Sequence, residues 1–271
     1  MADGLVGVVG GSGLYTLMGD ASPCSVTTPY GPHSDGLVVG TYAGRDVAFI
    51  PRHGLGHAHP PHRINYRANL WALASLGVTQ IVATCAAGSL RPELEPGAFV
   101  VPDQLVDRTG GRASTYVEHG PVHVGFAEPY CPTVRSVLVD AVRDTGSQVA
   151  DSGTMVVIDG ARFSTRAESE WYQAQGWHLV NMTGLPEAAL ARELALCYAP
   201  VAVVTDRDAG VAGHPSVTQV QAQEEFARSL ERLNHVLDKA IRTLPDRREC
   251  QCPTSLDRLA VDYLPKADPR D

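Results

Sequence analysis

Short apolar runs rich in β-branched residues recur along the chain, and stretches with helical periodicity separate several of them. Apolar residues spaced by three and four positions predict helices over 64–77, 132–146, 186–196 and 217–244. Pro132 at a helix start, and Gly77 and Gly146 at helix ends, agree with the usual preferences of these residues. The runs that predict strands are LVGVVG (5–10), VAFI (47–50), VTQIVAT (78–84), FVVP (99–102), GTMVVI (153–158), HLVNM (178–182) and VAVVTD (201–206).

Strands that alternate with helices predict an α/β protein with a largely parallel or mixed sheet. We expect one domain over residues 1–245, followed by a polar, proline-rich tail over 246–271. In such sheets, ligand sites lie at the carboxyl ends of strands. That rule selects four places, which are 10–13, 52–53, 84–89 and 206–208.

The composition excludes some classes of function. The net charge of −8 argues against a surface for nucleic acid or an anionic membrane, so an anion would have to bind in a local pocket. No apolar run approaches the roughly 18–20 residues that span a bilayer. The start of the chain, MADGLVGVVGG, lacks the basic region of a signal peptide, and we predict a cytoplasmic protein.

Six cysteines are scattered at positions 24, 85, 131, 197, 250 and 252. In a cytosolic chain these are expected to be mostly free thiols. Cys250 and Cys252 form the sequence CQC, which we interpret as exposed thiols. A redox pair or half of a metal site is the alternative, but the chain has no second pair with zinc-finger spacing.

Two stretches that follow strands predict an anion site. In GVVGGSGLY (7–15), glycine N–H groups and the Ser12 hydroxyl could converge on an anion. A tight turn between a strand and a loop is the alternative interpretation of the same residues. Arg52 and His53 follow a short strand directly, and a guanidinium suits phosphate oxygens. A third stretch, ATCAAGSL (83–90), has small side chains that would let a ligand approach the backbone.

Asp206 and Asp208 end the last strand run, and alternate residues of a strand face the same way. Two close carboxyl groups resist simultaneous ionisation, so one could keep its proton. A protonated carboxyl and a carboxylate complement the N7 acceptor and N6 donor of adenine, whereas a carboxylate would repel O6 of a 6-oxopurine. A metal site and a solvated strand end are the alternatives, and no nearby His or Glu completes a metal-ligand set.

Several of these stretches belong to a longer series of motifs. In order along the chain, the motifs are GGSGLY, PRHG, NYRANLWAL, GSL, DQLVDRT, EPYCP, GTMVVIDGARFSTRAES, NMTGLPEAALARE and TDRD. The chain resembles the trimeric-type purine nucleoside phosphorylases from about residue 5 to 243, and most closely the 5′-methylthioadenosine phosphorylases. The resemblance implies a single domain with a mixed, partly barrel-like sheet flanked by helices. It also implies a homotrimer with sites near the subunit interfaces.

The resemblance further implies the roles of individual residues. Phosphate would be held by Ser12, Arg52, His53, the backbone at Cys85 and Ala86, and Thr183. The base and ribose would meet Phe163, Ser164, Met182, Asp206 and Asp208, and His123 would reach the 5′ end of a nucleoside in the neighbouring subunit.

The implied reaction is attack of phosphate on C1′ while Asp206 shares a proton with N7 of the base. Phosphate is then a co-substrate, and no metal, flavin or nicotinamide is required.

Two positions at the predicted site depart from the family pattern, and Ala161 also replaces a common proline. Cys85 stands where Thr or Asn is common, and a thiol is a weaker donor. Gln219 lies near the expected 5′ pocket, where an apolar residue is usual; Val217 or Val220 could fill that role instead, with Gln219 facing solvent. If Gln219 enters the pocket, adenosine or 2′-deoxyadenosine would compete with methylthioadenosine. A 6-oxopurine phosphorylase, a hydrolase and a non-catalytic sensor are the remaining alternatives.

Overall fold

The computed structural model describes residues 4–11, 14, 18, 21–214 and 217–265. Its helices are α1 Tyr66–Ser75, α2 Pro132–Asp144, α3 Arg166–Ala174, α4 Gly184–Glu193 and α5 Gln219–Thr243. Its strands are β1 Leu5–Gly10, β2 Ser22–Pro23, β3 Val38–Tyr42, β4 Arg45–Pro51, β5 Val78–Ser89, β6 Phe99–Val100, β7 Gln104–Arg108, β8 Val149–Ala150, β9 Thr154–Ile158, β10 Leu179–Asn181 and β11 Cys197–Arg207. Short 3₁₀ turns lie at Leu55–His57, Pro61–Arg63, Val211–Gly213 and Cys252–Thr254.

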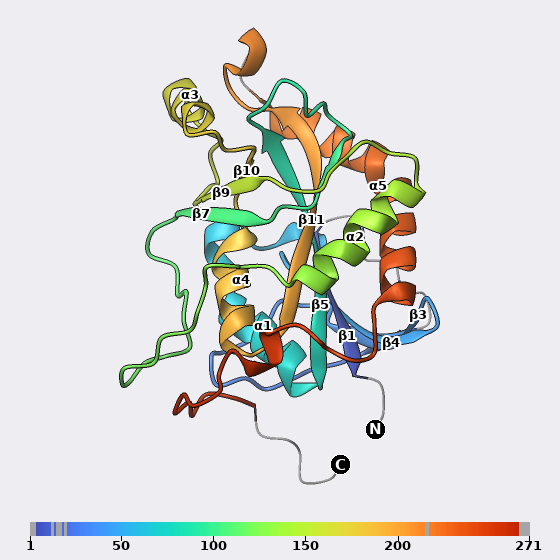
Figure 1. The fold of residues 1–271 in the computed structure, drawn as a ribbon, viewed down its shortest axis with the longest axis vertical. Helices are drawn as coiled ribbons and strands as arrows, with labels where there is room; N and C mark the ends of the chain where they lie inside the picture. The colour runs from blue at the N-terminus through green and yellow to red at the C-terminus, as the bar shows by residue number, and fades with distance from the viewer. Residues whose placement is uncertain (1–3, 12–13, 15–17, 19–20, 215–216, 266–271) are drawn as a thin grey trace.

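The strands form one mixed sheet in the order β2-β3-β4-β1-β5-β10-β9-β7, which branches at β5 to include β11, β6 and β8. The central strands β4, β1, β5 and β11 are all parallel, so their carboxyl ends point the same way. Figure 1 shows β5 and β11 as two long neighbouring strands. The predicted α/β class with a mixed sheet flanked by helices is confirmed.

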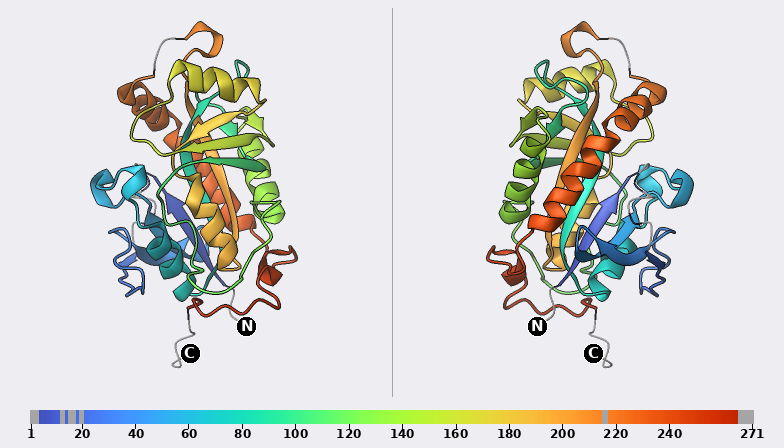
Figure 2. Two further views of the ribbon diagram at one scale, coloured as in Figure 1. Left: turned by 90° about the vertical axis from the view of Figure 1, so that its left-hand side faces the viewer. Right: turned by 90° about the vertical axis from the view of Figure 1, so that its right-hand side faces the viewer.

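Helices α1, α2, α4 and α5 cover the sheet with buried apolar side chains. In α5, Leu233, Val236, Leu237, Ala240 and Ile241 are buried, at the spacing of one helix face. Helix α5 packs against α2 and β11, and α4 packs against α1 and β11 (Figures 1 and 2). Among the described residues, no helix is long and apolar enough to cross a membrane.

The helix ends follow the predicted signals. Pro132 is the first residue of α2. Gly77 and Gly146 follow the last residues of α1 and α2 by two positions, with φ of 85° and 68°. That left-handed backbone is the reason for glycine at these helix ends.

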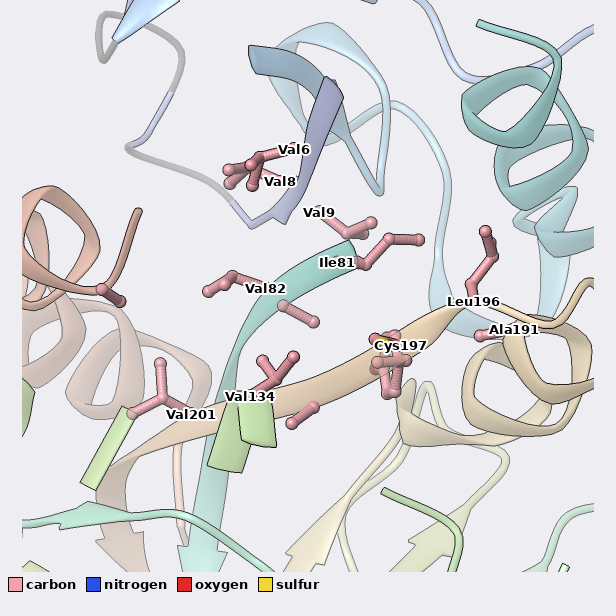
Figure 3. Close-up of a cluster of buried hydrophobic side chains, with 14 of the residues drawn as sticks. Val6, Val8, Val9, Ile81, Val82, Val134, Ala191, Leu196, Cys197 and Val201 are labelled. Carbon is pink, nitrogen blue, oxygen red and sulfur yellow. The ribbon is translucent and has the colours of Figure 1, made fainter. Parts of the chain in front are cut away.

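The core lies where the parallel strands meet the helices. Strand β1 is buried on both faces, with Val6, Val8 and Val9 fully covered, as expected of a strand inside a parallel sheet. Figure 3 shows these valines with Ile81 and Val82 of β5 and with Cys197 and Val201 of β11. The two long strands β5 and β11 therefore run through the apolar core.

Two predictions about local structure were wrong. The strand predicted over 78–84 was too short, because β5 continues to Ser89 and β11 pairs with it from Thr84 to Ser89. Cys252 is only 2% exposed and Cys250 is half-buried, so the CQC sequence is not a pair of exposed thiols. Both cysteines pack against the body of the protein, and the described tail continues over it, where Trp71 donates a hydrogen bond to the Tyr263 carbonyl.

Candidate active site

A cavity of about 670 Å³ lies at the carboxyl ends of β1, β4, β5 and β11. All four stretches selected from the sequence contribute to its wall, the first through Gly11. Of the residues predicted to form a site, the wall contains Arg52, His53, Cys85, Ala86, Phe163, Ser164, Met182, Thr183, Asp206, Asp208 and Gln219. Ser12 lies outside the described residues. His123 is exposed in the loop between β7 and α2 and belongs to the described residues that do not line this cavity.

One end of the cavity is acidic. Asp206 pairs with Gly88 of β5 just after a bulge in β11, and a side chain at Gly88 would come within 2.9 Å of the Asp206 Oδ1 atom. A glycine therefore leaves room for this carboxyl. Burial raises the pKa of Asp206 to about 6, with a hydrogen bond from Thr205 opposing the shift and the Asp208 carboxylate adding to it. Asp206 can consequently hold a proton close to neutral pH.

Asp208 shares this end of the cavity. Burial raises its pKa, while the Ser164 and Ser169 hydroxyls favour the ionised form. Its Oδ2 atom is buried and has no hydrogen-bond partner among the described residues. Arg207, between the two acids in sequence, instead pairs with Glu95 and donates to His214. The two carboxyl groups thus face the cavity without a cation from their own strand.

The other end of the cavity contains a buried ion pair that the sequence analysis missed. The Arg52 Nε and Nη2 atoms each donate a 2.8 Å hydrogen bond to Glu187 of α4, and Nη1 donates to the Thr84 carbonyl. Tyr198 donates to the same carboxylate at 2.8 Å. Burial opposes the charged form of Arg52, but Glu187 outweighs it and raises the pKa of Arg52 above its ordinary value.

The two hydrogen bonds to Glu187 and the one to the Thr84 carbonyl occupy three of the five N–H groups of Arg52. One N–H on Nη1 and one on Nη2 make no hydrogen bond to the described residues. Arg52 therefore keeps two donors for a ligand, while Glu187 fixes the plane of its guanidinium.

His53 carries no charge at neutral pH. Burial lowers its pKa to about 3, and the adjacent Arg52 guanidinium acts in the same direction. Its Nδ1 atom lies 2.9 Å from the His59 carbonyl, which can only accept, so Nδ1 carries the proton and Nε2 has a lone pair. The sequence placed His53 beside Arg52 among the predicted phosphate contacts, and in the structure its ring is neutral, with an Nε2 atom that makes no hydrogen bond to the described residues.

Asn181 joins two segments of the wall. Its Oδ1 atom accepts from the backbone N–H groups of Thr183 and Gly184 at 2.7 and 2.6 Å, and its Nδ2 atom donates to the Ala86 carbonyl. This side chain ties the start of α4 to β5. The Cys85 side chain beside it is a thiol, because burial raises its pKa to about 12.

Arg112 supports the wall beside the predicted base pocket. Its guanidinium donates to the backbone carbonyls of Met182 and Leu185 at 2.8 Å and of Asp159 at 2.7 Å. These bonds hold the segment that carries Phe163 against the segment that carries Met182. Nothing in the sequence pattern around Arg112 marks this role.

Helix α5 forms the remaining wall. Gln219, its first residue, lines the cavity together with Gln223, Phe226 and Leu230, whereas Val220 is 62% exposed. The position of Gln219, left open by the sequence, is therefore in the cavity wall. The wall is mixed, with two amides nearer the start of the helix and apolar side chains further along it.

The geometry and the comparisons define the same class of protein. The model of the phosphorylase superfamily matches residues 5–242, and the chain belongs to this family. A purine nucleoside phosphorylase of Streptomyces coelicolor is 52% identical over 92% of both chains. An S-methyl-5′-thioadenosine phosphorylase of Mycolicibacterium smegmatis is 54% identical over 91% of this chain and 93% of its own.

A solved structure of similar fold is a methylthioadenosine phosphorylase from an antarctic soil metagenomic library. Its TM-score is 0.88 at 37% identity, with 94% of this chain and 92% of that chain covered. The resemblance identified from the sequence is confirmed.

Proposed function

We propose that this protein is a phosphorylase that cleaves the N-glycosidic bond of 5′-methylthioadenosine, or of another 5′-modified adenosine. Its products would be adenine and 5-methylthioribose 1-phosphate. The observation that carries the proposal is the pair Asp206 and Asp208 facing one cavity, with the raised pKa of Asp206 and with Arg52 at the opposite end. The names of the relatives support the same reaction.

The acidic end supplies the proton. As phosphate attacks C1′, the bond from C1′ to N9 breaks and negative charge develops on adenine. Asp206 in its acid form donates to N7, and Asp208 as a carboxylate accepts from N6–H. A donor whose pKa lies near 6 is matched to this transfer at neutral pH, and a carboxylate would repel O6 of a 6-oxopurine.

The other end orients phosphate. Arg52 offers its two remaining N–H groups, and the backbone at Cys85 and Ala86 and the side chain of Thr183 complete the contacts, with Ser12 as a further predicted donor. The lone pair of His53 Nε2 would accept a hydrogen bond from the one hydroxyl of monohydrogen phosphate. Phosphate is then a co-substrate that also stabilises the cationic ribose, and the reaction uses no other cofactor.

A second candidate substrate follows from the mixed wall of α5. Phe226 and Leu230 suit a methylthio group, but the amides of Gln219 and Gln223 could bond a 5′-hydroxyl. Adenosine and 2′-deoxyadenosine are therefore the alternative substrates. Phe163 and Ser164 would contact the base, and Met182 the ribose.

The assembly belongs to the same proposal. A homotrimer would bring the exposed His123 of one subunit towards the 5′ end of a nucleoside in the next. The phosphorylase domain would span residues 1–245 and the tail 246–271, in a protein located in the cytoplasm.

The test is to incubate the purified protein with methylthioadenosine, adenosine, 2′-deoxyadenosine and inosine, each with and without phosphate, and to measure free base. We expect adenine release that requires phosphate and is fastest from methylthioadenosine, with little release from inosine. Adenosine turned over equally well would favour the second candidate. Equal turnover without phosphate would mean hydrolysis, and no release from any substrate would exclude catalysis on these nucleosides.

A further inference from the structure

Four cysteines that are far apart in the sequence come together at the end of β11 opposite the cavity. Cys131 precedes the first residue of α2, Cys197 begins β11, and Cys250 and Cys252 come from the tail. Their sulfur atoms all lie within 4.8 Å of one another, and Cys131, Cys197 and Cys252 are buried. We call these residues the four-cysteine cluster.

The spacing of the sulfur atoms fits a shared metal ion. Cys250 Sγ lies 3.3 Å from Cys197 Sγ and 3.6 Å from Cys131 Sγ. Four sulfurs at about 2.3 Å from a central zinc stand about 3.8 Å apart at the corners of a tetrahedron. The cluster is therefore close to the size of that tetrahedron, whereas a disulfide needs a sulfur separation of about 2 Å and joins only two cysteines.

The local sequence gives a second reason to expect a ligand. Cys250 and Cys252 lie in DRRECQCPT, a polar stretch that has little to gain from burial, yet Cys252 is 2% exposed. Cys131 stands at the N-cap position of α2, where the helix dipole favours a thiolate. A buried cation would account for both the burial of the tail and the position of Cys131.

The donor set selects the metal. Four thiolates are soft ligands, and a tetrahedral all-sulfur site is typical of structural zinc. Asp206 lies nine positions after Cys197 along β11, which places the cluster roughly 30 Å from the acidic end of the cavity. A metal there would be structural and would take no part in the reaction.

We propose that the four-cysteine cluster binds one Zn²⁺ ion and thereby fixes the tail to α2 and β11. The four thiols lose their protons to solvent on binding, so metal affinity falls as the pH is lowered. Beyond the metal, the tail is held by hydrogen bonds such as that from Arg248 Nη1 to the Ala195 carbonyl at 2.9 Å. Zinc would join the tail, which is otherwise held by such weak contacts, to α2 and β11 in the core of the fold.

The first test is the metal content of the full-length protein, purified without a metal-affinity tag or chelator and measured by mass spectrometry of the elements. We expect about one zinc per chain, falling below about 0.1 in a Cys250→Ser/Cys252→Ser variant. Cys24→Ser is the matched control, because Cys24 lies outside the cluster, and it should keep its zinc. Cys250→His, which retains a zinc ligand, guards against a folding defect and should also bind zinc.

The second test measures what the metal does. Chelation of zinc from the wild-type protein should lower its melting temperature by several degrees and expose the tail to protease, while the phosphorolysis rate at 25 °C stays unchanged. Wild-type protein that contains no zinc, or that contains iron in its place, would overturn the proposal. So would intact masses showing two disulfides among these four cysteines in protein purified under reducing conditions.

Discussion

At one end of the cavity the charge of Arg52 is neutralised by two hydrogen bonds of 2.8 Å to Glu187, whereas at the other end Asp206 and Asp208 form no ion pair with any described residue. Both ends are buried, so the low-dielectric surroundings act on both. The paired guanidinium stays charged at every accessible pH. The unpaired carboxyl of Asp206 instead has its pKa raised to about 6. Pairing suits a group that must only bind, and its absence suits a group that must exchange a proton.

The largest effect should follow from removing the exchangeable proton. We expect Asp206→Asn to lower adenine release from methylthioadenosine by about 10²- to 10⁴-fold, the usual contribution of a positioned acid. The preference for adenine over hypoxanthine nucleosides should remain, because the Asp208 carboxylate assigned to position 6 of the base is unchanged. Steady-state rates on both substrates measure this. Asp46→Asn, at an exposed position of β4, is the control, and unchanged adenine release in Asp206→Asn would refute the assigned role.

Breaking the ion pair between Arg52 and Glu187 should lower the stability of the fold as well as the activity. Glu187→Gln leaves the Arg52 charge buried and uncompensated, which we expect to cost about 3–5 kcal/mol of unfolding free energy. The surface pair of Arg166 and Glu170 provides the contrast, because Glu170→Gln should cost less than about 1 kcal/mol. Urea denaturation of both variants measures the difference. Equal stabilities would mean that the buried pair does not hold the Arg52 end of the cavity together.

Replacing the unpaired carboxyl of Asp206 should have the opposite effect and raise the free energy of unfolding. The pKa of Asp206 is raised from 3.8 to about 6, so the folded protein binds its proton more tightly than the unfolded chain does. The stabilisation from that proton is complete below pH 3.8 and is lost as the pH rises through 6. Asp206→Asn should therefore raise the unfolding free energy at pH 8 by up to about 3 kcal/mol, and by much less at pH 3.5.

The same titration predicts the pH profile of the wild-type enzyme. Corrected for the ionisation of phosphate, kcat/KM should fall about tenfold per pH unit above pH 6. In Asp206→Asn this limb of the profile should disappear. Its persistence in the variant would assign the titration to another group.

The smallest effect concerns the wall of α5. Gln219→Leu removes the amide that could bond a 5′-hydroxyl, so the preference for methylthioadenosine over adenosine should rise by about fivefold, equivalent to about 1 kcal/mol. Val220→Leu, on the exposed face of the same helix, should leave the preference unchanged. A preference that does not move in Gln219→Leu would place Gln219 outside the contacts that select the 5′ group.

Local patterns predicted β1, β4, β5, β6, β9, β10 and β11, four of the helices, and the strand ends that meet at the cavity. The acids were found because Asp206 and Asp208 interrupt a β-branched run at its carboxyl end. Helix α3 was missed although Thr165 and Glu168 form a capping box, a signal that the sequence contains. The extension of β5 to Ser89 could not be predicted from its small residues, because pairing with β11 determines it.

Residues that contact each other over a long sequence separation could not be predicted from the sequence pattern. Glu187 belongs to a stretch that reads as an ordinary helix, and its role depends on Arg52, which lies 135 residues away. The four-cysteine cluster could not be predicted for the same reason. The spacing of Cys131 and Cys197 in the sequence is not that of metal ligands, and they lie beside the CQC sequence only in the folded protein. Residues that act through one strand end were predictable, and residues that act through tertiary pairing were not.

The central claim is that Asp206 donates a proton to N7 during phosphorolysis, and a substrate lacking N7 tests it most directly. The measurement compares kcat/KM for methylthioadenosine and its 7-deaza analogue in the wild-type protein and in Asp206→Asn. We predict a large ratio in favour of methylthioadenosine in the wild type, which collapses in the variant because neither substrate then receives the proton. An equal ratio in both proteins would contradict the claim, because it would show that N7 and Asp206 act independently.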